Sequence, residues 1–190
     1  KKTKVDMNIV HLTDLHYSEK GKDPSKVINA IITKIKEENI VIDFVFFTGD
    51  IVNIGADDAQ YSKAVNLLFG ALQSELNVDA SNIIICPGNH DIDRSKISKS
   101  LKSYFNTDIN DNLSLNKFYK SKDNDFQNSL SPLTPYRNFA NSFYNEGAEN
   151  ELCDIYSLHY RQFQNKRIAI LGLYTPWLSA LFGGEDKGNL

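Results

Sequence analysis

The stretch Asn8-Ile-Val-His-Leu-Thr-Asp-Leu-His16 decides the fold, because a strand-like run ends there in an Asp and a His one residue apart. Two later stretches have the same form, since apolar runs lead into Gly49-Asp-Ile-Val-Asn53 and into Gly88-Asn-His-Asp91. All three runs are short and rich in β-branched or aromatic side chains, which is typical of buried strands. We therefore predict strands over 8–13, 42–48 and 82–86.

Amphipathic helices are predicted between these strands. Asp23 and Pro24 are residue types that begin a helix, and apolar residues follow at helical spacing as far as Ile35. Asp57 is expected to cap a second helix, whose apolar stripe extends over 61–76. Alternation of strands and helices predicts an α/β fold with right-handed crossovers and a mainly parallel first sheet. Parallel strands bring their carboxyl ends to one edge, so the three polar motifs should meet there.

Composition limits the classes of protein that fit. The 190 residues, of which 41% are hydrophobic, suffice for one core, so we expect a single domain over 1–190. A formal net charge of −3 argues against a dedicated nucleic-acid-binding protein. Cys86 and Cys153 are too few for a disulfide framework, and no apolar run has the length of a membrane span. These features predict a cytoplasmic location and no membrane partner.

The series D-L-H, G-D-I-V-N and G-N-H-D resembles the calcineurin-like metallophosphoesterase superfamily, closely over about the first half of the chain. The resemblance implies a four-layer αββα sandwich and a hydrolase that acts on phosphoester bonds. It makes Asp14 and His16 ligands of one metal ion, Asp50 the carboxylate that bridges two ions, and Asn89 a ligand of the second ion. His90 would contact the phosphate and protonate the leaving oxygen.

The chemistry of these residue types supports a dinuclear site. Two divalent ions roughly 3.5 to 4 Å apart activate a water as hydroxide and neutralise the phosphoryl oxygens. Mixed nitrogen and oxygen ligands favour Mn, Fe or Zn, with Mg as an alternative, and no organic cofactor is predicted. Histidine titrates near neutral pH, which suits His90 to general-acid catalysis.

Asn53 and Asp91 are two further catalytic candidates. Some family members carry an Asp that orients the catalytic His at the position of Asn53, and Asn53 can still hydrogen-bond to His90 without supplying a charge. On this hypothesis, Asn53→Asp changes the acid limb of the pH–rate profile. Asp91 is a candidate because it follows His90 directly.

The later half of the chain departs from the family pattern. The family completes its metal shells with downstream histidines, including a G-H-x-H pair, whereas this chain has only four His residues. We therefore expect an N-terminal piece of a longer protein, with an incomplete sandwich, further domains after Leu190 and weak or no activity by itself. The segment 155–174 predicts a hairpin that begins the second sheet. We interpret His159 as part of this hairpin, in preference to a substitute metal ligand, and His11 as a core residue.

Residues 93–152 form a segment rich in Asn, Ser and aromatics. We interpret it as a solvated helical excursion whose aromatic residues pack beneath it. The alternative is a substrate-side cap, in which cations such as Lys99, Lys102 and Lys120 attract an anionic substrate and aromatic rings stack on a base.

The leading hypothesis is a metal-dependent phosphoesterase that hydrolyses phosphomonoesters or phosphodiesters through a hydroxide activated by two metal ions. A nucleotide, a small diester and a phosphoprotein all fit as substrates, and nucleic acid is a less favoured alternative. A catalytically silent module that senses metal or phosphate is the runner-up, although the complete ligand set argues against it. A nuclease of the same fold is a third hypothesis, which salt-sensitive DNA binding would favour.

Overall fold

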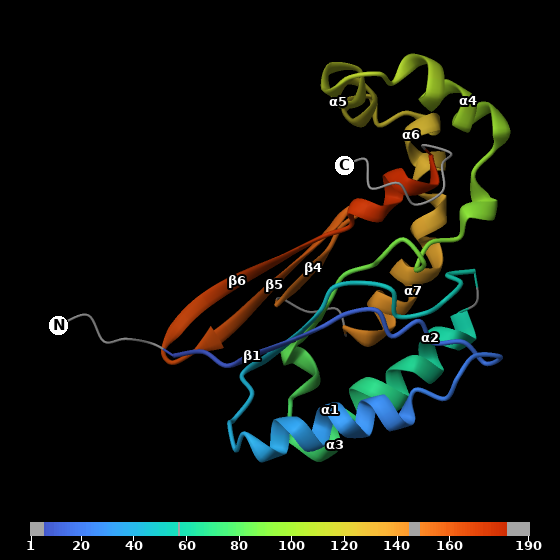
Figure 1. The fold of residues 1–190 in the computed structure, drawn as a ribbon. Coiled ribbons are helices and arrows are strands. Elements are labelled where there is room, and N and C mark those ends of the chain that lie inside the picture. The colour runs from blue at the N-terminus through green and yellow to red at the C-terminus, as the bar shows by residue number, and fades with distance from the viewer. Residues whose placement is uncertain (1–5, 57, 145–148, 182–190) are drawn as a thin grey trace.

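The structure, a computed structural model, describes residues 6–56, 58–144 and 149–181. It contains two three-stranded sheets that lie face to face, with helices on the outer side of the first sheet and beyond one end of the sheets (Figure 1). In the first sheet all strands are parallel, with Ile9 opposite Phe44 and Val45 opposite Ile83. The predicted parallel sheet is confirmed, and its strands in spatial order are β1 (Ile9–Leu12), β2 (Phe44–Phe47) and β3 (Ile83–Ile85).

One face of the first sheet is covered by helices α1 (Ser25–Glu37) and α3 (Gly70–Leu76) (Figure 1). The apolar stripe of α1 buries Ile28 and Ile32 in the main core, in agreement with the predicted spacing. The Asp23 carboxylate accepts hydrogen bonds from the main-chain N–H and the hydroxyl of Ser25, at 2.9 and 2.6 Å. The helix begins at Ser25, one residue after the predicted start at Pro24, and Pro24 takes the N-cap position predicted for Asp23.

The second crossover is a continuous helical segment with an internal irregularity. It runs from α2 (Asp58–Ala64) through a π-helical turn, Val65–Phe69, into α3. The wider turn leaves both Leu68 and Phe69 buried, although they are adjacent in the sequence. The sequence pattern predicted a helix here but not this turn, and Asp57, the predicted cap, lies outside the described residues.

The second sheet packs on the opposite face of the first. Its strands are antiparallel, and Gln164 and Asn165 form a two-residue turn with φ values of 46° and 64°, which confirms the predicted hairpin. The rings of Phe44 and Phe163 are 6.1 Å apart, which places the two sheets in contact. The strands in spatial order are β4 (Asn150–Leu152), β5 (Tyr156–Phe163) and β6 (Lys166–Leu173).

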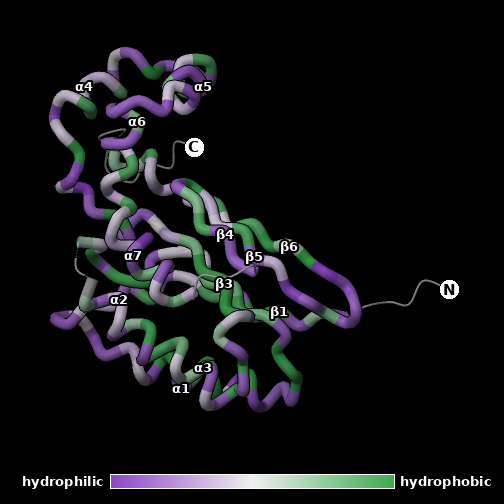
Figure 2. The backbone as a smooth tube through the Cα atoms, turned by 180° about the vertical axis from the view of Figure 1, so that it is seen from behind, coloured by the Kyte–Doolittle hydropathy of each residue, from purple (hydrophilic) through white to green (hydrophobic). Residues whose placement is uncertain are grey.

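The outer face of the second sheet is open to solvent. Leu171 and Leu173 on β6 are 57% and 55% exposed, and Figure 2 shows hydrophobic residues along this strand. Within the described residues no helix covers this face (Figure 1). A helical layer and two sheets of the expected four-layer sandwich are therefore present in the described part of the chain.

In the helical excursion, residues 93–144, the helices before residue 130 stand away from the sheets, and the last helix returns beside β3 (Figure 1). Phe105, Phe118 and Phe126 are buried inside it in edge-to-face contacts, and Phe126 lies 6.0 Å from the ring of Trp177. These contacts support the interpretation that its aromatic residues pack beneath it. Its helices are α4 (Lys99–Asp108), α5 (Asn112–Ser121), α6 (Asn124–Ser129) and α7 (Thr134–Phe143).

Tyrosine hydroxyls satisfy the outer edge of β3. Tyr144 accepts a hydrogen bond from the N–H of Ile85 at 2.7 Å and donates one to the carbonyl of Ile83 at 3.0 Å. Tyr136, on α7, donates to the carbonyl of Ile85 at 3.0 Å. Burial raises the pKa of both tyrosines well above the usual value, so the hydroxyls remain donors. An edge that would otherwise offer unpaired backbone groups is thereby closed.

The prediction that His11 belongs to the core is wrong. Its side chain is exposed, with Nε2 2.7 Å from the hydroxyl of Thr48, because β1 is an edge strand.

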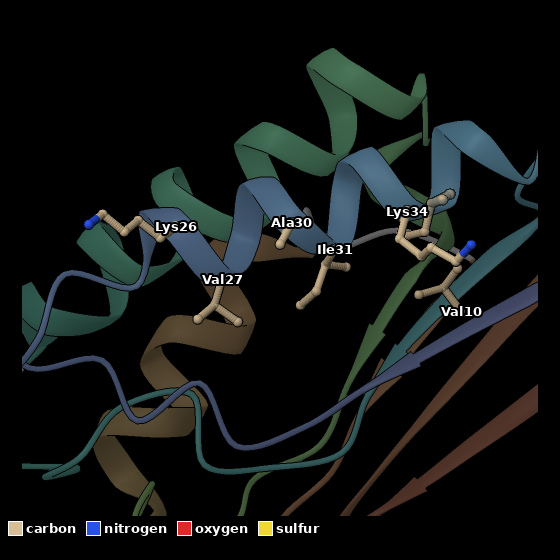
Figure 3. A pocket seen from close by; sticks show the side chains of 7 residues that line it. Val10, Lys26, Val27, Ala30, Ile31 and Lys34 are labelled. Atoms are coloured by element: carbon tan, nitrogen blue, oxygen red, sulfur yellow. The ribbon is translucent and has the colours of Figure 1, made fainter.

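An apolar groove of about 550 Å³ lies between β1 and α1, rimmed by Lys26 and Lys34 (Figure 3), and contains none of the predicted site residues. In the described part of the chain, no helix has the length and apolar character needed to cross a bilayer.

Candidate metal centre

The three polar motifs meet at the carboxyl edge of the first sheet. The N–H groups of Asp14 and His16 donate to the carbonyls of Gly49 and Asp50, at 3.0 and 2.8 Å, so the loops after β1 and β2 are joined. The N–H of His90 donates to Oδ1 of Asp50 at 2.9 Å, which adds the loop after β3. Parallel pairing thus continues beyond the strand ends and brings together residues that are far apart in the sequence.

Four side chains form a cluster of potential metal ligands at this edge. One ligand atom from each of His16, Asp50 and His90 lies within 4.8 Å of the other two. Nε2 of His16 is 3.4 Å from Oδ1 of Asp14 and 3.7 Å from Oδ2 of Asp50. These separations exceed normal hydrogen bonds and are close to the roughly 3.0 to 3.4 Å between neighbouring ligands of an ion bound at about 2.1 Å. The nitrogen and carboxylate oxygen donors therefore fit a divalent cation.

Asn89 lies directly beside this cluster. It is half-buried and stands between Gly88 and His90, both of which contact Asp50. A Cβ atom on Gly88 would collide with the carboxylate of Asp50, and one on Gly49, whose φ is +127°, would lie 2.7 Å from Cα of Gly88. Both positions therefore require glycine for the loops to cross this closely.

Three of the predicted ligands have strained backbones. Asp14, His16 and Asp50 adopt left-handed φ values of 60°, 47° and 56°. For a residue with a side chain this conformation costs about 1 to 2 kcal/mol, and such strain concentrates at functional sites. The sequence gives no signal for it, because none of the three is a glycine.

Asp91 connects two of the motifs from below. Its carboxylate is 0% exposed and accepts hydrogen bonds from the N–H groups of Ile51, Val52 and Gly88, at 3.2, 3.0 and 2.8 Å. Burial raises its pKa to about 6, against the effect of these hydrogen bonds. Its own main-chain carbonyl accepts the hydroxyl of Tyr61 at 2.7 Å. This geometry makes Asp91 a structural link between the loops after β2 and β3, and the catalytic role suggested by its location after His90 stays a prediction.

Asn53 contacts His90 through its main chain. Nδ1 of His90 lies 2.9 Å from the carbonyl oxygen of Asn53. A carbonyl oxygen only accepts hydrogen bonds, so Nδ1 carries the hydrogen and Nε2 is the nitrogen that remains for a ligand or a proton. His90 thus makes its hydrogen bond to the main-chain carbonyl of Asn53 and not, as the sequence had led us to expect, to the side chain. Every residue type has this carbonyl.

His159 lies outside the ligand cluster. It is buried in β5, where Nδ1 is 2.9 Å from Oδ1 of Asn150, its partner on β4. Burial, together with the nearby charge of Arg161, lowers the pKa of His159 to about 4. Its position agrees with the hairpin interpretation.

Comparison with known proteins assigns the chain to a family. A sequence profile described as calcineurin-like phosphoesterase matches residues 7–179, which include every residue of the cluster and the whole helical excursion. A comparison with functionally curated proteins gave no match. The profile covers most of the chain, and the loops that carry the chain's three polar motifs converge. This protein therefore belongs to the calcineurin-like phosphoesterase family.

Proposed function

We propose that this protein is a metal-dependent phosphoesterase that hydrolyses phosphomonoesters or phosphodiesters. The observation that carries the proposal is the convergence of His16, Asp50 and His90 within 4.8 Å, with Asp14 beside His16. A mere structural cluster has no need of two carboxylates and two histidines that face one another without a direct hydrogen bond. The family supports hydrolysis of phosphoester bonds in general.

Four residues have the chemistry to hold metal ions. Asp14 and His16 would hold one divalent ion, Asn89 a second, and Asp50 would contribute to both. Bound ions supply Lewis acidity, which activates water and neutralises charge on phosphoryl oxygens. Mn, Fe and Zn suit this donor set best. The side chain of Asp14 is 57% exposed, so the site is open to ions and substrate from solvent.

In this proposal His90 serves the leaving group. The carbonyl of Asn53 contacts Nδ1 and fixes the orientation of the imidazole ring, so Nε2 is left for a ligand. From Nε2 the ring can hydrogen-bond a phosphoryl oxygen or give a proton to the departing oxygen. Asp91 maintains the distance between the loops that carry Asp50 and His90, because it binds main-chain N–H groups of both.

The substrate is expected to be a nucleotide, a small diester or a phosphoprotein. The test is a panel of p-nitrophenyl monoester and diester substrates with Mn²⁺, Zn²⁺ or Mg²⁺, applied to the wild type, Asp50→Asn and His90→Ala. We expect metal-dependent turnover that both substitutions abolish. Asp43→Asn, which removes a carboxylate bonded to the N–H of Asn8 near the other end of the sheet, serves as the control. Metal binding without turnover of any ester would favour the silent sensing module.

A further inference from the structure

Positive charge is concentrated in one part of the chain. Residues 94–122 contain seven Lys and Arg against two Asp, although the whole chain has a formal net charge of −3. Four of these lysines form two pairs with a spacing of three residues, Lys99 and Lys102 on α4 and Lys117 and Lys120 on α5. Side chains at this spacing lie on one face of a helix, so each helix presents a pair of cations. Both helices stand away from the sheets (Figure 1).

The four lysines of α4 and α5 form no ion pair with the described residues. All four are exposed or half-exposed. Elsewhere Lys34 and Lys36 each contact a glutamate, at 2.8 and 2.6 Å, whereas no carboxylate of the described residues lies within 4.0 Å of the ammonium groups of these four. Asp111 has its charge near Lys117, but its carboxylate also caps the first turn of α5. The positive charge of this surface is therefore available to a partner.

The aromatic and apolar side chains of these helices face inward. The rings of Phe105 and Phe118 are buried and lie 4.8 Å apart, edge to face, between α4 and α5. Among the described residues, Tyr104 has the only exposed ring of the helical excursion, and it packs 6.0 Å from the rings of both phenylalanines. Proteins that bind single strands stack bases on exposed rings, and a helix that binds a membrane exposes an apolar face. This surface offers cations on a rigid scaffold without either feature.

We propose that the outer surface of α4 and α5 binds the phosphate backbone of duplex DNA. Lysine contacts to phosphates need charge and reach but no access to the bases. A helix of this length extends about 15 Å, over which a duplex carries about nine phosphates, so both lysines of a helix can contact the backbone. Residues outside 94–122 are acidic in total, which confines DNA to this surface. The inference goes beyond the proposed function, because the surface includes no residue of the candidate metal centre.

The test is the fluorescence anisotropy of a labelled DNA duplex, titrated with protein in EDTA at several salt concentrations. If each of the four lysines neutralises one phosphate, the logarithm of the association constant should fall with the logarithm of salt concentration with a slope of about −3 to −4. The variant Lys99→Gln/Lys102→Gln/Lys120→Gln should reduce this slope by about 2 to 3 and weaken binding at about 50 mM salt by at least roughly 10-fold. Replacement of the same lysines by Arg keeps the charges and should preserve binding within about 3-fold.

The matched control is Lys26→Gln/Lys36→Gln/Lys166→Gln, which removes three exposed charges from α1 and β6 and should change the affinity by less than about 2-fold. An equal loss in the control would indicate diffuse attraction and overturn the proposal. So would no salt-dependent binding by the wild type, or tighter binding of a single strand of the same length. Because EDTA removes the metal ions and no ester is hydrolysed, failure of this proposal is distinguishable from failure of the proposed function.

Discussion

The main-chain N–H of His90 donates a 2.9 Å hydrogen bond to Oδ1 of Asp50. This contact joins the loop after β3 to the loop after β2 and fixes one carboxylate oxygen of Asp50. The residue Asp50 is only 8% exposed. The other oxygen, Oδ2, is 3.7 Å from Nε2 of His16. Asp50 thus presents its two oxygens to residues of two different loops.

Asp50→Asn should abolish metal binding without unfolding the site. The amide keeps an oxygen for the N–H of His90 but loses the charge that offsets a cation. Loss of a residue that only orients a metal ligand lowers metal affinity by roughly 10- to 100-fold. Because Asp50 would be a ligand itself, we expect the affinity for Mn²⁺ to fall by at least roughly 100-fold. Calorimetric titration measures this change, with Asp43→Asn as the matched carboxylate control. Unaltered Mn²⁺ affinity in Asp50→Asn would remove Asp50 from the site.

Asp91→Ala should be strongly destabilising. It leaves the buried N–H groups of Ile51, Val52 and Gly88 without their acceptor, so the free energy of unfolding should fall by roughly 3 to 5 kcal/mol. Asp91→Asn keeps one acceptor oxygen and should cost less. Urea unfolding in the absence of metal measures both effects. The control is Asp108→Ala, at an exposed carboxylate, which should change the free energy of unfolding by less than about 0.5 kcal/mol. An equally small change in Asp91→Ala would contradict the role of Asp91 as a link between the loops.

The tautomer of His90 should not depend on the side chain of Asn53. Because the carbonyl of Asn53 accepts from Nδ1, the neutral ring should carry its hydrogen on Nδ1 in the wild type and in Asn53→Ala alike. Long-range ¹H–¹⁵N correlation spectra distinguish the two tautomers. A change to the Nε2–H form in Asn53→Ala would show that the side chain orients the ring, as the sequence interpretation held.

His159 should make the protein less stable in acid. Its pKa is about 4 in the folded state, below the ordinary 6.5, so the unfolded state binds more protons between these values. The free energy of unfolding should therefore fall as the pH drops from 6.5 to 4, by about 3 kcal/mol in total. Asp91, with a raised pKa of about 6, has the opposite effect on the free energy of unfolding in this pH range. Its contribution is the same in the wild type and in a His159 variant, so it cancels when the two are compared.

The comparison that isolates this effect is wild type against His159→Phe, unfolded by urea at pH 7 and pH 4. Relative to the wild type, the variant should lose less stability on acidification, by about 3 kcal/mol. Equal pH dependence in both proteins would show that His159 does not titrate on unfolding in this range.

Tyr144→Phe should weaken the edge of β3. It leaves the N–H of Ile85 and the carbonyl of Ile83 without the hydroxyl that contacts both, at a cost of about 1 to 3 kcal/mol in the free energy of unfolding. Tyr104→Phe, at a ring that is 39% exposed, is the control and should have little effect. Equal stability of the two variants would mean that water replaces the lost hydroxyl.

Local patterns were sufficient to locate several elements of the fold. Helical spacing located α1, since Ile28 and Ile32 need only be on one face of a helix to be buried together. The hairpin was predictable because its turn and both arms are contiguous in the sequence. The π-helical turn and the exposure of His11 were not predictable, because both depend on how well neighbouring elements cover that part of the chain.

The sequence by itself determined the order of strands and helices and the residue types that reach the carboxyl edge of the first sheet, because both are local properties of the chain. Only the tertiary structure decided that Asp91 is buried as a link between loops and that Asn53 holds His90 by its carbonyl. These features arise from contacts between separate segments, whose distances follow from packing and not from spacing along the chain.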